Sequence, residues 1–119
     1  MKSVLLIAAV LLSSAVFAEV SSESKMEIDH LVSFVENTPC KINRNGKYHD
    51  GSEAISHIQK KYEYFKDRIN TAEQFIEYSA TKSTMSGKYY LVKCGDSQPF
   101  KTREWLLKEL ENYREKNHT

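Results

Sequence analysis

The spacing of apolar side chains predicts that the folded chain begins with an amphipathic helix. Between residues 26 and 37, apolar side chains recur at i, i+3, i+4 and i+7 from Ile28 to Val35, which places them on one helix face. Pro39 cannot continue a helix, so we expect the helix to end before it. Residues 19–25 are small and polar, and they predict a flexible leader.

The apolar period then shortens to two residues, which indicates β-strands. Cys40 and Ile42 alternate with polar neighbours, and Asn45-Gly46 follows shortly after them. Asn-Gly favours the positive φ angles that a two-residue hairpin turn needs. Residues 40–49 are therefore predicted to form two short antiparallel strands joined by a tight turn.

Two helices are predicted between residues 50 and 80, each with a capping pattern at its start. Asp50 and Glu53 begin the first helix, and Asn70 and Glu73 begin the second near residue 71. Apolar side chains follow at intervals of three and four residues, so each helix packs through one seam. The inward-facing side chains are expected to be those of Ile55, Ile58, Tyr62, Phe65, Ile69, Phe75 and Ile76, with Lys60, Lys61 and Lys66 facing outward.

The last third of the chain predicts one more strand and one more helix. Residues 89–94 alternate in polarity, with Val92 and Cys94 on one face of the strand. Thr102 is predicted to cap the final helix. Together these elements predict an α+β fold that is mainly helical, with about four helices packed on a small antiparallel sheet of about three strands. Residues 26–119 are expected to form this single domain.

The first eighteen residues, 1–18, predict a secretory signal peptide. Lys2 gives a positive start, Val4 to Leu12 is an uninterrupted apolar run, and Ala18 is the small residue expected before the cleavage point. A membrane anchor is the alternative, but the run is shorter than the roughly 20 residues that span a bilayer. We therefore expect export, cleavage after Ala18 and no membrane anchor afterwards.

The charge of the chain argues against one class of partner. Lys2 is the only basic residue in the signal peptide, so 16 of the 17 basic residues remain after cleavage, and they equal the 16 acidic residues. A domain that binds nucleic acid normally has a clear basic excess, so we expect no nucleic acid partner. No motif predicts a cofactor.

The two cysteines, Cys40 and Cys94, predict a disulfide. An even cysteine count in an oxidising compartment favours pairing, and closing so long a loop stabilises a fold by about 4 kcal/mol in the chain-entropy model. The sequence contains no C-x-x-C motif and no cysteine pair at zinc-finger spacing. The bond would place the strand at 89–94 beside the hairpin.

A candidate metal site consists of His49, Glu53 and His57, which follow one another at intervals of four residues. On a continuous helix they would share one face, and such a face can hold a metal. Asp50-Gly51 places His49 before the helix, although its ring can still fold back towards Glu53. The structural alternative pairs His57 with Glu53 one helical turn earlier.

Ser79 and Lys82 form a candidate hydrolase pair. They fit the pattern S-x-x-K, in which a lysine one turn away activates a serine nucleophile. The companion motifs are absent, and a lysine at a helix C-terminus is common because it interacts favourably with the helix dipole.

Polar and aromatic side chains around the predicted turns form a candidate binding surface. Tyrosine and arginine are favoured at recognition surfaces. The alternative is that strand tyrosines cover a small core and that turns are simply polar. The predicted surface consists of Arg44, Asn45, Lys47, Tyr48, His49, Lys88 and Tyr89.

Five short segments of the chain form a specific combination. They are Arg44-Asn45-Gly46, His49, residues 53–57 (EAISH), residues 68–76 (RINTAEQFI) and residues 86–90 (SGKYY). This combination resembles a family of small exported bacterial proteins that is classed as a domain of unknown function. The resemblance covers residues 28–114. It implies a Gram-negative periplasmic setting, and it implies no activity.

These observations lead to three functional hypotheses. The leading one is a non-enzymatic periplasmic protein that binds a periplasmic protein or an envelope component through the hairpin turn and the start of the second helix. The second is a small metal-dependent enzyme or hydrolase that uses His49, Glu53 and His57. The third is an inhibitor or immunity protein for an envelope-acting toxin, which small size, export and a disulfide would suit. No residue is assigned a catalytic role.

Overall fold

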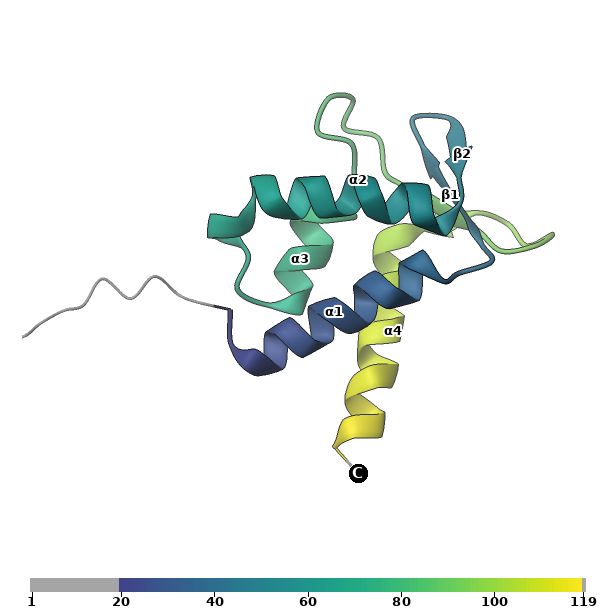
Figure 1. The fold of residues 1–119 in the computed structure, drawn as a ribbon. Coiled ribbons are helices and arrows are strands. Elements are labelled where there is room, and N and C mark those ends of the chain that lie inside the picture. Colours follow the sequence, from purple (N-terminus) through teal and green to yellow (C-terminus); the bar gives the residue numbers. More distant parts are fainter. Residues whose placement is uncertain (1–19, 119) are drawn as a thin grey trace, which may run out of the picture.

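The computed structural model describes residues 20–118, in which four helices pack around one another and beside a small sheet (Figure 1). The predicted signal peptide, residues 1–18, lies outside the described residues. The helices are α1 (Ser22–Glu36), α2 (Gly51–Tyr64), α3 (Ala72–Ser79) and α4 (Thr102–Asn117), with a 3₁₀ turn, η1 (Lys66–Arg68). The strands are β1 (Lys41–Arg44), β2 (Lys47–His49), β3 (Leu91–Lys93) and β4 (Phe100–Lys101). The predicted α+β, mainly helical class is confirmed.

Helix α1 begins four residues earlier than the apolar pattern predicts. The side chain of Ser21 accepts a hydrogen bond from the backbone N–H of Ser24 at 3.1 Å, so it caps a helix that starts at Ser22. Glu23 adds a negative charge to the first turn, which the helix dipole favours. The prediction of a flexible leader is therefore wrong for residues 22–25. These residues form the first turn of α1, which is polar because it lies mostly at the surface.

The predicted cap of α2 is confirmed, but the helix is shorter than its apolar seam. The carboxylate of Asp50 accepts from the backbone N–H of Glu53 at 2.9 Å. Helix α2 ends at Tyr64, and the chain then tightens into η1. Ile69 is buried in extended backbone after η1, so it reaches the core from outside the helix.

Helix α3 is capped by Thr71 rather than by Asn70. The hydroxyl of Thr71 accepts from the backbone N–H of Gln74 at 3.1 Å, and the side chain of Gln74 accepts from the N–H of Asn70 at 2.7 Å. The two reciprocal bonds resemble a capping box displaced by one residue from the predicted pair.

The sheet has four strands rather than three, in the order β2-β1-β3-β4 with antiparallel neighbours. Strand β3 is shorter than predicted and covers only Leu91–Lys93. The unpredicted strand β4 pairs Phe100 with Val92 and Lys101 with Leu91. The segment before Phe100 is polar, and a strand of two residues is too short to show an alternating pattern in the sequence.

The predicted role of Thr102 as a helix cap is wrong. Thr102 is the first residue of α4 and is completely buried, and Lys101 occupies the cap position without a side-chain hydrogen bond. The backbone N–H of Thr102 donates to the carbonyl of Tyr90 at 2.9 Å, and this bond anchors the start of α4 to the sheet. Its hydroxyl has no hydrogen-bond partner within the described part of the chain.

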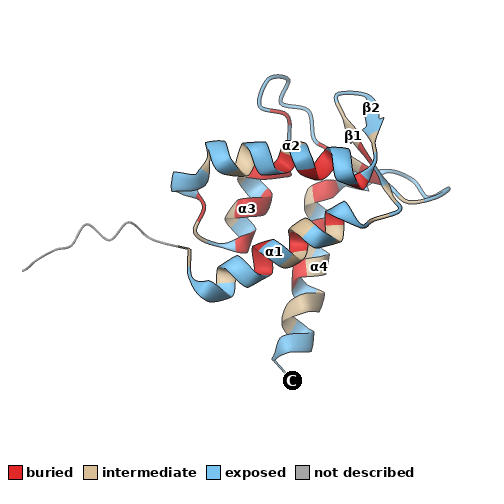
Figure 2. Ribbon diagram, in the orientation of Figure 1, coloured by how far each residue is buried: buried red, intermediate tan, exposed pale blue. Residues whose placement is uncertain are grey.

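The core lies where the four helices face one another and where the inner sheet face meets α2 (Figure 2). Gly51 lets α1 and α2 approach closely, because a β-carbon there would overlap the carbonyl oxygen of Val35. None of the helices in residues 20–118 is long and apolar enough to cross a membrane. The largest fully buried side chains include those of Ile28, Leu31, Ile69, Phe75, Ile76 and Leu106.

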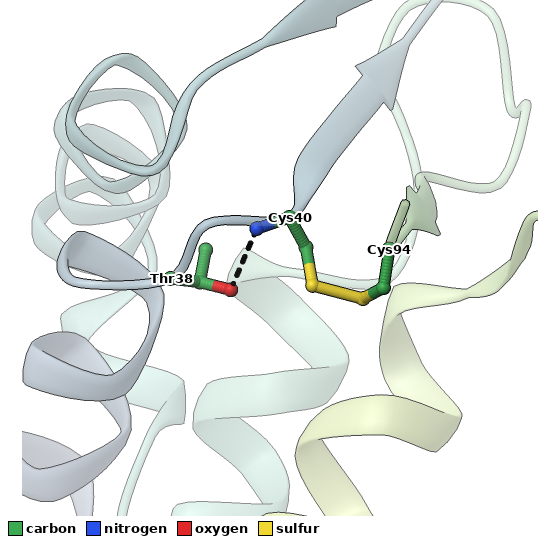
Figure 3. The surroundings of a disulfide bond; sticks show 3 residues. All are labelled: Thr38, Cys40 and Cys94. Carbon is green, nitrogen blue, oxygen red and sulfur yellow. Dashed lines mark hydrogen bonds between the residues drawn. A yellow bond between two sulfur atoms is a disulfide. The ribbon is translucent and has the colours of Figure 1, made fainter. Parts of the chain in front are cut away.

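The predicted disulfide between Cys40 and Cys94 is present in the structure (Figure 3). Lys41 pairs with Lys93, so the two cysteines occupy the next opposed position of β1 and β3. Their Cα atoms are 4.4 Å apart, which suits a pair of residues that exchange no backbone hydrogen bonds. The N–H of Cys40 donates to the hydroxyl of Thr38 at 3.1 Å. The bond therefore closes the end of the ladder between the two central strands.

Candidate functional site

A groove runs between the first turns of α2 and the inner face of the hairpin, and we refer to it as the α2 groove. Ile42 pairs with His49, and side chains alternate along β1, so Ile42, Arg44 and His49 share the sheet face that meets α2. The groove has a volume of about 430 Å³. A hollow of about 20 Å³ at its base reaches Ile42 and Tyr90. The groove is lined by Arg44, His49, Ser52, Glu53, Ser56, His57 and Lys60.

His49 and Glu53 form a pair at the mouth of the α2 groove. Nδ1 of His49 lies 3.1 Å from Oε2 of Glu53. The Asp50 cap starts α2 between them, so the imidazole at the end of β2 meets a carboxylate in the first helical turn. The side chain of Glu53 remains largely exposed, which limits the strength of the pair.

His57, Tyr90 and Lys61 form a polar chain at the base of the groove. The hydroxyl of Tyr90 lies 3.3 Å from Nε2 of His57, and Nζ of Lys61 donates to that hydroxyl at 3.3 Å. Lys61 also donates to the carbonyl of Lys82 at 2.7 Å and lies 5.0 Å from the Tyr90 ring centroid. The prediction that Lys61 faces outward is therefore wrong, because its ammonium group bends back to the sheet.

The environment keeps the imidazole of His57 uncharged at neutral pH. Burial lowers the pKa of His57 to about 4, and the positive charges of Arg44 and Lys61 add to the effect. Burial also lowers the pKa of Lys61, with a further contribution from Arg44. Burial raises the pKa of Tyr90, although Arg44 opposes this shift. The base of the groove thus holds a neutral imidazole and a neutral phenol beside positive charges.

The groove has an excess of positive charge. Arg44 and Lys60 form no ion pair with any residue between 20 and 118, and Lys61 donates only to neutral oxygens there. Glu53 is the only carboxylate among the lining residues, and His49 already lies against it. The arrangement can therefore attract an anionic group, and the neutral imidazole can accept a proton.

The structure does not assemble a metal site from His49, Glu53 and His57. His49 folds back onto Glu53, whereas His57 turns to Tyr90 instead of pairing with Glu53. Within residues 20–118, no three histidine, cysteine, aspartate or glutamate side chains are grouped so that they could hold a metal ion.

The S-x-x-K pair has no geometry for hydrolysis. The hydroxyl of Ser79 is completely buried and has no hydrogen-bond partner in the described chain, whereas Lys82 is exposed. A substrate cannot reach a nucleophile in that position.

The seven residues of the predicted binding surface divide between different parts of the molecule. Arg44 and His49 line the α2 groove. Tyr48 pairs with Asn43, so it lies on the opposite, outer face of the sheet, where 44% of its surface is exposed. Tyr89 lies on the outer face as well, because Nζ of Lys101 sits 4.1 Å from its ring centroid and Lys101 pairs with Leu91. Lys47 and Lys88 are exposed and line neither the groove nor its base.

Asn45 has a structural role at the tip of the hairpin. Its side-chain nitrogen donates to the hydroxyl of Ser83 at 3.3 Å, and its side-chain oxygen accepts from the hydroxyl of Ser86 at 2.6 Å. The backbone φ of Asn45 is +54°, as the predicted tight turn requires. The two projecting loops at the top of Figure 1 are therefore tied to each other.

Three residues in or next to the groove did not stand out in the sequence. Lys61 follows His57 by four residues, so one helical turn places both on the same side of α2. Ser56 also lines the groove and precedes His57 directly. Tyr90 joins them only through the register of β1 and β3, which sequence spacing does not reveal.

Comparison with known proteins identifies the family of the chain. A model described as "Family of unknown function (DUF5329)" matches residues 22–114. The chain is 34% identical over 90 residues to the uncharacterised protein YfeK of Salmonella typhimurium, and the match covers 75% of each chain. No solved structure matches the chain. The resemblance inferred from the five segments is thereby confirmed, and the protein belongs to the family of unknown function DUF5329.

Proposed function

We propose that this protein is located in the periplasm, has no catalytic activity and binds a partner, which enters the α2 groove. The partner is another periplasmic protein or a component of the cell envelope. The predicted signal peptide supports export, and the disulfide between Cys40 and Cys94 suits an oxidising compartment.

The observation that carries the proposal is the uncompensated charge of Arg44. Its guanidinium group lies on the groove wall and has no carboxylate partner in residues 20–118. Arginine is enriched among the residues that dominate binding energy, because its planar group makes several directed hydrogen bonds. Since α2 and the sheet fix the groove walls, a partner would meet a largely preformed site.

Native mass spectrometry of the protein purified from its own periplasm tests this proposal. Arg44 and Tyr48 lie on opposite sheet faces, so Arg44→Ala and Tyr48→Ala separate the groove from the outer face. We expect wild type and Tyr48→Ala to retain the same additional mass, and Arg44→Ala to lose it. Retention by Arg44→Ala would contradict binding in the groove, and loss only in Tyr48→Ala would assign binding to the outer face.

An enzyme that uses proton transfer is a second candidate, favoured by the neutral imidazole of His57 beside the hydroxyl of Tyr90. Such an imidazole is in the unprotonated form that a general base requires, but a pKa of about 4 makes it a weaker base than an ordinary histidine. A screen with chromogenic ester and phosphate substrates checks this function. Hydrolysis that disappears in His57→Gln would support it, whereas hydrolysis that persists in this variant would count against it.

A further inference from the structure

The residues of the α2 groove favour one chemical class of ligand. The side chains of Arg44 and Lys60 bring two positive charges to the groove, and Lys61 adds a third behind its base, where it donates to the hydroxyl of Tyr90. Glu53 offsets one of them and is itself engaged by His49. The hydroxyl group of Ser56 lies among the lining residues as a further donor. Several cations with a neighbouring hydroxyl group suit an oxyanion that carries more than one negative charge.

The hollow at the base of the groove is too small for a ligand group, so a ligand would lie in the open part above it. The hollow, about 20 Å³, has room for roughly one water molecule. The apolar side chains of Ile42, Ala54 and Ile58 close it below, so a ring or a long apolar group finds no cavity there. The part above the hollow has a volume of about 430 Å³ and is open to solvent, so a tetrahedral group can enter it while attached to a larger molecule.

We propose that the α2 groove binds a phosphoryl group, held chiefly by the guanidinium group of Arg44. This inference rests on the proposed function and names the chemistry of the ligand. A guanidinium group can donate two parallel hydrogen bonds to phosphoryl oxygens, which an ammonium group cannot do. Lys60 supplies further charge from α2, and Lys61 is held in place by Tyr90 and by the carbonyl of Lys82.

His57 couples this binding to pH. Its imidazole is neutral at physiological pH, because burial and the neighbouring cations oppose protonation. A bound dianion offsets these cations, so the ring can take up a proton as the ligand binds. By reciprocity, protonation of His57 strengthens anion binding by the same factor. The charged and titratable groups that face the ring are Arg44 from β1, His49 from β2, Tyr90 before β3, and Glu53, Lys60 and Lys61 from α2.

Sulfate is the first probe, because it stays a dianion throughout the pH range in which His57 titrates. We would titrate sulfate into the disulfide-bonded protein at constant ionic strength and follow the NMR signals of His57 and of the backbone. If the bound state raises the pKa of His57 by about two units, binding at pH 5 is about tenfold tighter than at pH 7. Inorganic phosphate at neutral pH should shift the same signals.

Arginine variants show whether the response is specific. Arg44→Gln should abolish most of the sulfate response, and Arg44→Lys should restore only part of it because the two parallel bonds are lost. Lys93→Gln is the matched control: it removes an exposed cation from the outer sheet face and should leave binding unchanged. A sulfate response equal to that of chloride, or one that survives in Arg44→Gln, would overturn the inference. Tighter binding of acetate than of phosphate would also overturn it.

A further measurement identifies the source of the phosphoryl group. Sulfate-competable binding to vesicles of phosphatidylethanolamine with phosphatidylglycerol would indicate a lipid headgroup. Binding of inorganic phosphate without vesicle binding would indicate a soluble ligand. If the additional mass in the native mass spectrum is lost in Arg44→Ala but no oxyanion binds, the proposed function stands and the phosphoryl assignment fails. If no oxyanion binds and Arg44→Ala also keeps that mass, both proposals fail.

Discussion

The hydroxyl oxygen of Tyr90 lies 3.3 Å from Nε2 of His57. Because Lys61 donates a hydrogen bond to the same oxygen, the tyrosine proton is free to point at Nε2. The imidazole then carries its own proton on Nδ1. The contact therefore stabilises the neutral form of His57 with a defined tautomer.

Nitrogen NMR of His57 tests this arrangement. We expect the Nδ1-H tautomer at neutral pH and a titration midpoint at about 4. Tyr90→Phe should raise the midpoint, because it removes the donor that favours the uncharged ring. Tyr89→Phe, on the outer sheet face, should not change it. A midpoint near the ordinary histidine value of about 6.5 would contradict both the burial of the ring and the proposed hydrogen bond.

The depressed pKa of His57 predicts a loss of stability in mild acid. In the unfolded chain this histidine takes up a proton near pH 6.5, whereas in the folded protein it does so only near pH 4. Between these values the unfolded state binds more protons, so the free energy of unfolding falls as the pH is lowered. Because the ring is partly exposed, we expect a loss of about 1–2 kcal/mol rather than the full value of the shift.

Urea unfolding at pH 7, 6 and 5 measures this effect. His57→Gln is the informative variant, because its stability should depend much less on pH across this range. The hydrogen bond from Arg114 keeps the pKa of Glu73 below its ordinary value. This carboxylate therefore changes the free energy of unfolding mainly at lower pH. An equal loss in wild type and His57→Gln would assign the acid sensitivity to another group.

Arg114 joins three helices through two carboxylates. It donates to Glu27 on α1 at 2.7 and 3.0 Å and to Glu73 on α3 at 2.8 and 3.0 Å. The side chain of Glu27 is only 7% exposed, so Arg114→Met leaves a buried carboxylate without its partner. We expect a loss of about 3 kcal/mol in the free energy of unfolding, measured by urea denaturation.

Arg103→Met is the matched control for this ion pair. Arg103 contacts Glu77 and Glu104, and more than half of each carboxylate side chain is exposed. Exposed pairs of this kind contribute less than about 1 kcal/mol. Similar losses in the two arginine variants would show that burial of Glu27 does not govern the contribution of Arg114.

Gly51 is required where α1 and α2 meet. A β-carbon at this position would overlap the carbonyl oxygen of Val35 and lie 2.9 Å from that of Glu36. Backbone atoms cannot rotate away, so Gly51→Ala should destabilise the fold by about 3 kcal/mol or more. Gly87→Ala meets no atom within 4 Å and should cost about 1 kcal/mol through its positive φ angle. Thermal unfolding compares the two, and equal losses would contradict the close approach of the helices.

Local signals predicted the elements that depend on neighbouring residues. Asn45-Gly46 adopts the positive φ angles of its hairpin turn, and Asp50 caps α2 through a bond to Glu53 three residues away. The pairing of Cys40 with Cys94 followed from an even cysteine count and not from geometry. Alternation predicted that Val92 and Cys94 share a face, and the disulfide predicted that their strand lies beside the hairpin, where Val92 pairs with Ile42.

Features that depend on distant contacts were missed. Thr102 has the residue type of a cap, but its backbone bond to Tyr90 draws it into the core. Lys61 has the outward position of a surface lysine, but a carbonyl on the loop at residue 82 and the Tyr90 hydroxyl attract its ammonium group. The candidate site was partly predictable because Arg44, His49, Glu53 and His57 are close in sequence, whereas Tyr90 comes from the distant segment just before β3.

The disulfide links the two strand segments that carry the walls of the groove. Arg44 is at the end of β1, Tyr90 directly precedes β3, and the bond between Cys40 and Cys94 joins these two strands at their other ends.

Closing a loop of this length stabilises the fold by about 4 kcal/mol in the chain-entropy model. For a domain of this size we expect reduction, or the double substitution Cys40→Ala with Cys94→Ala, to lower the melting temperature by about 15 °C or more. Melting curves with and without reductant measure the loss, and the double variant should not respond to reductant. Free thiols in the native protein, or a wild-type melting temperature that reductant leaves unchanged, would contradict a stabilising bond.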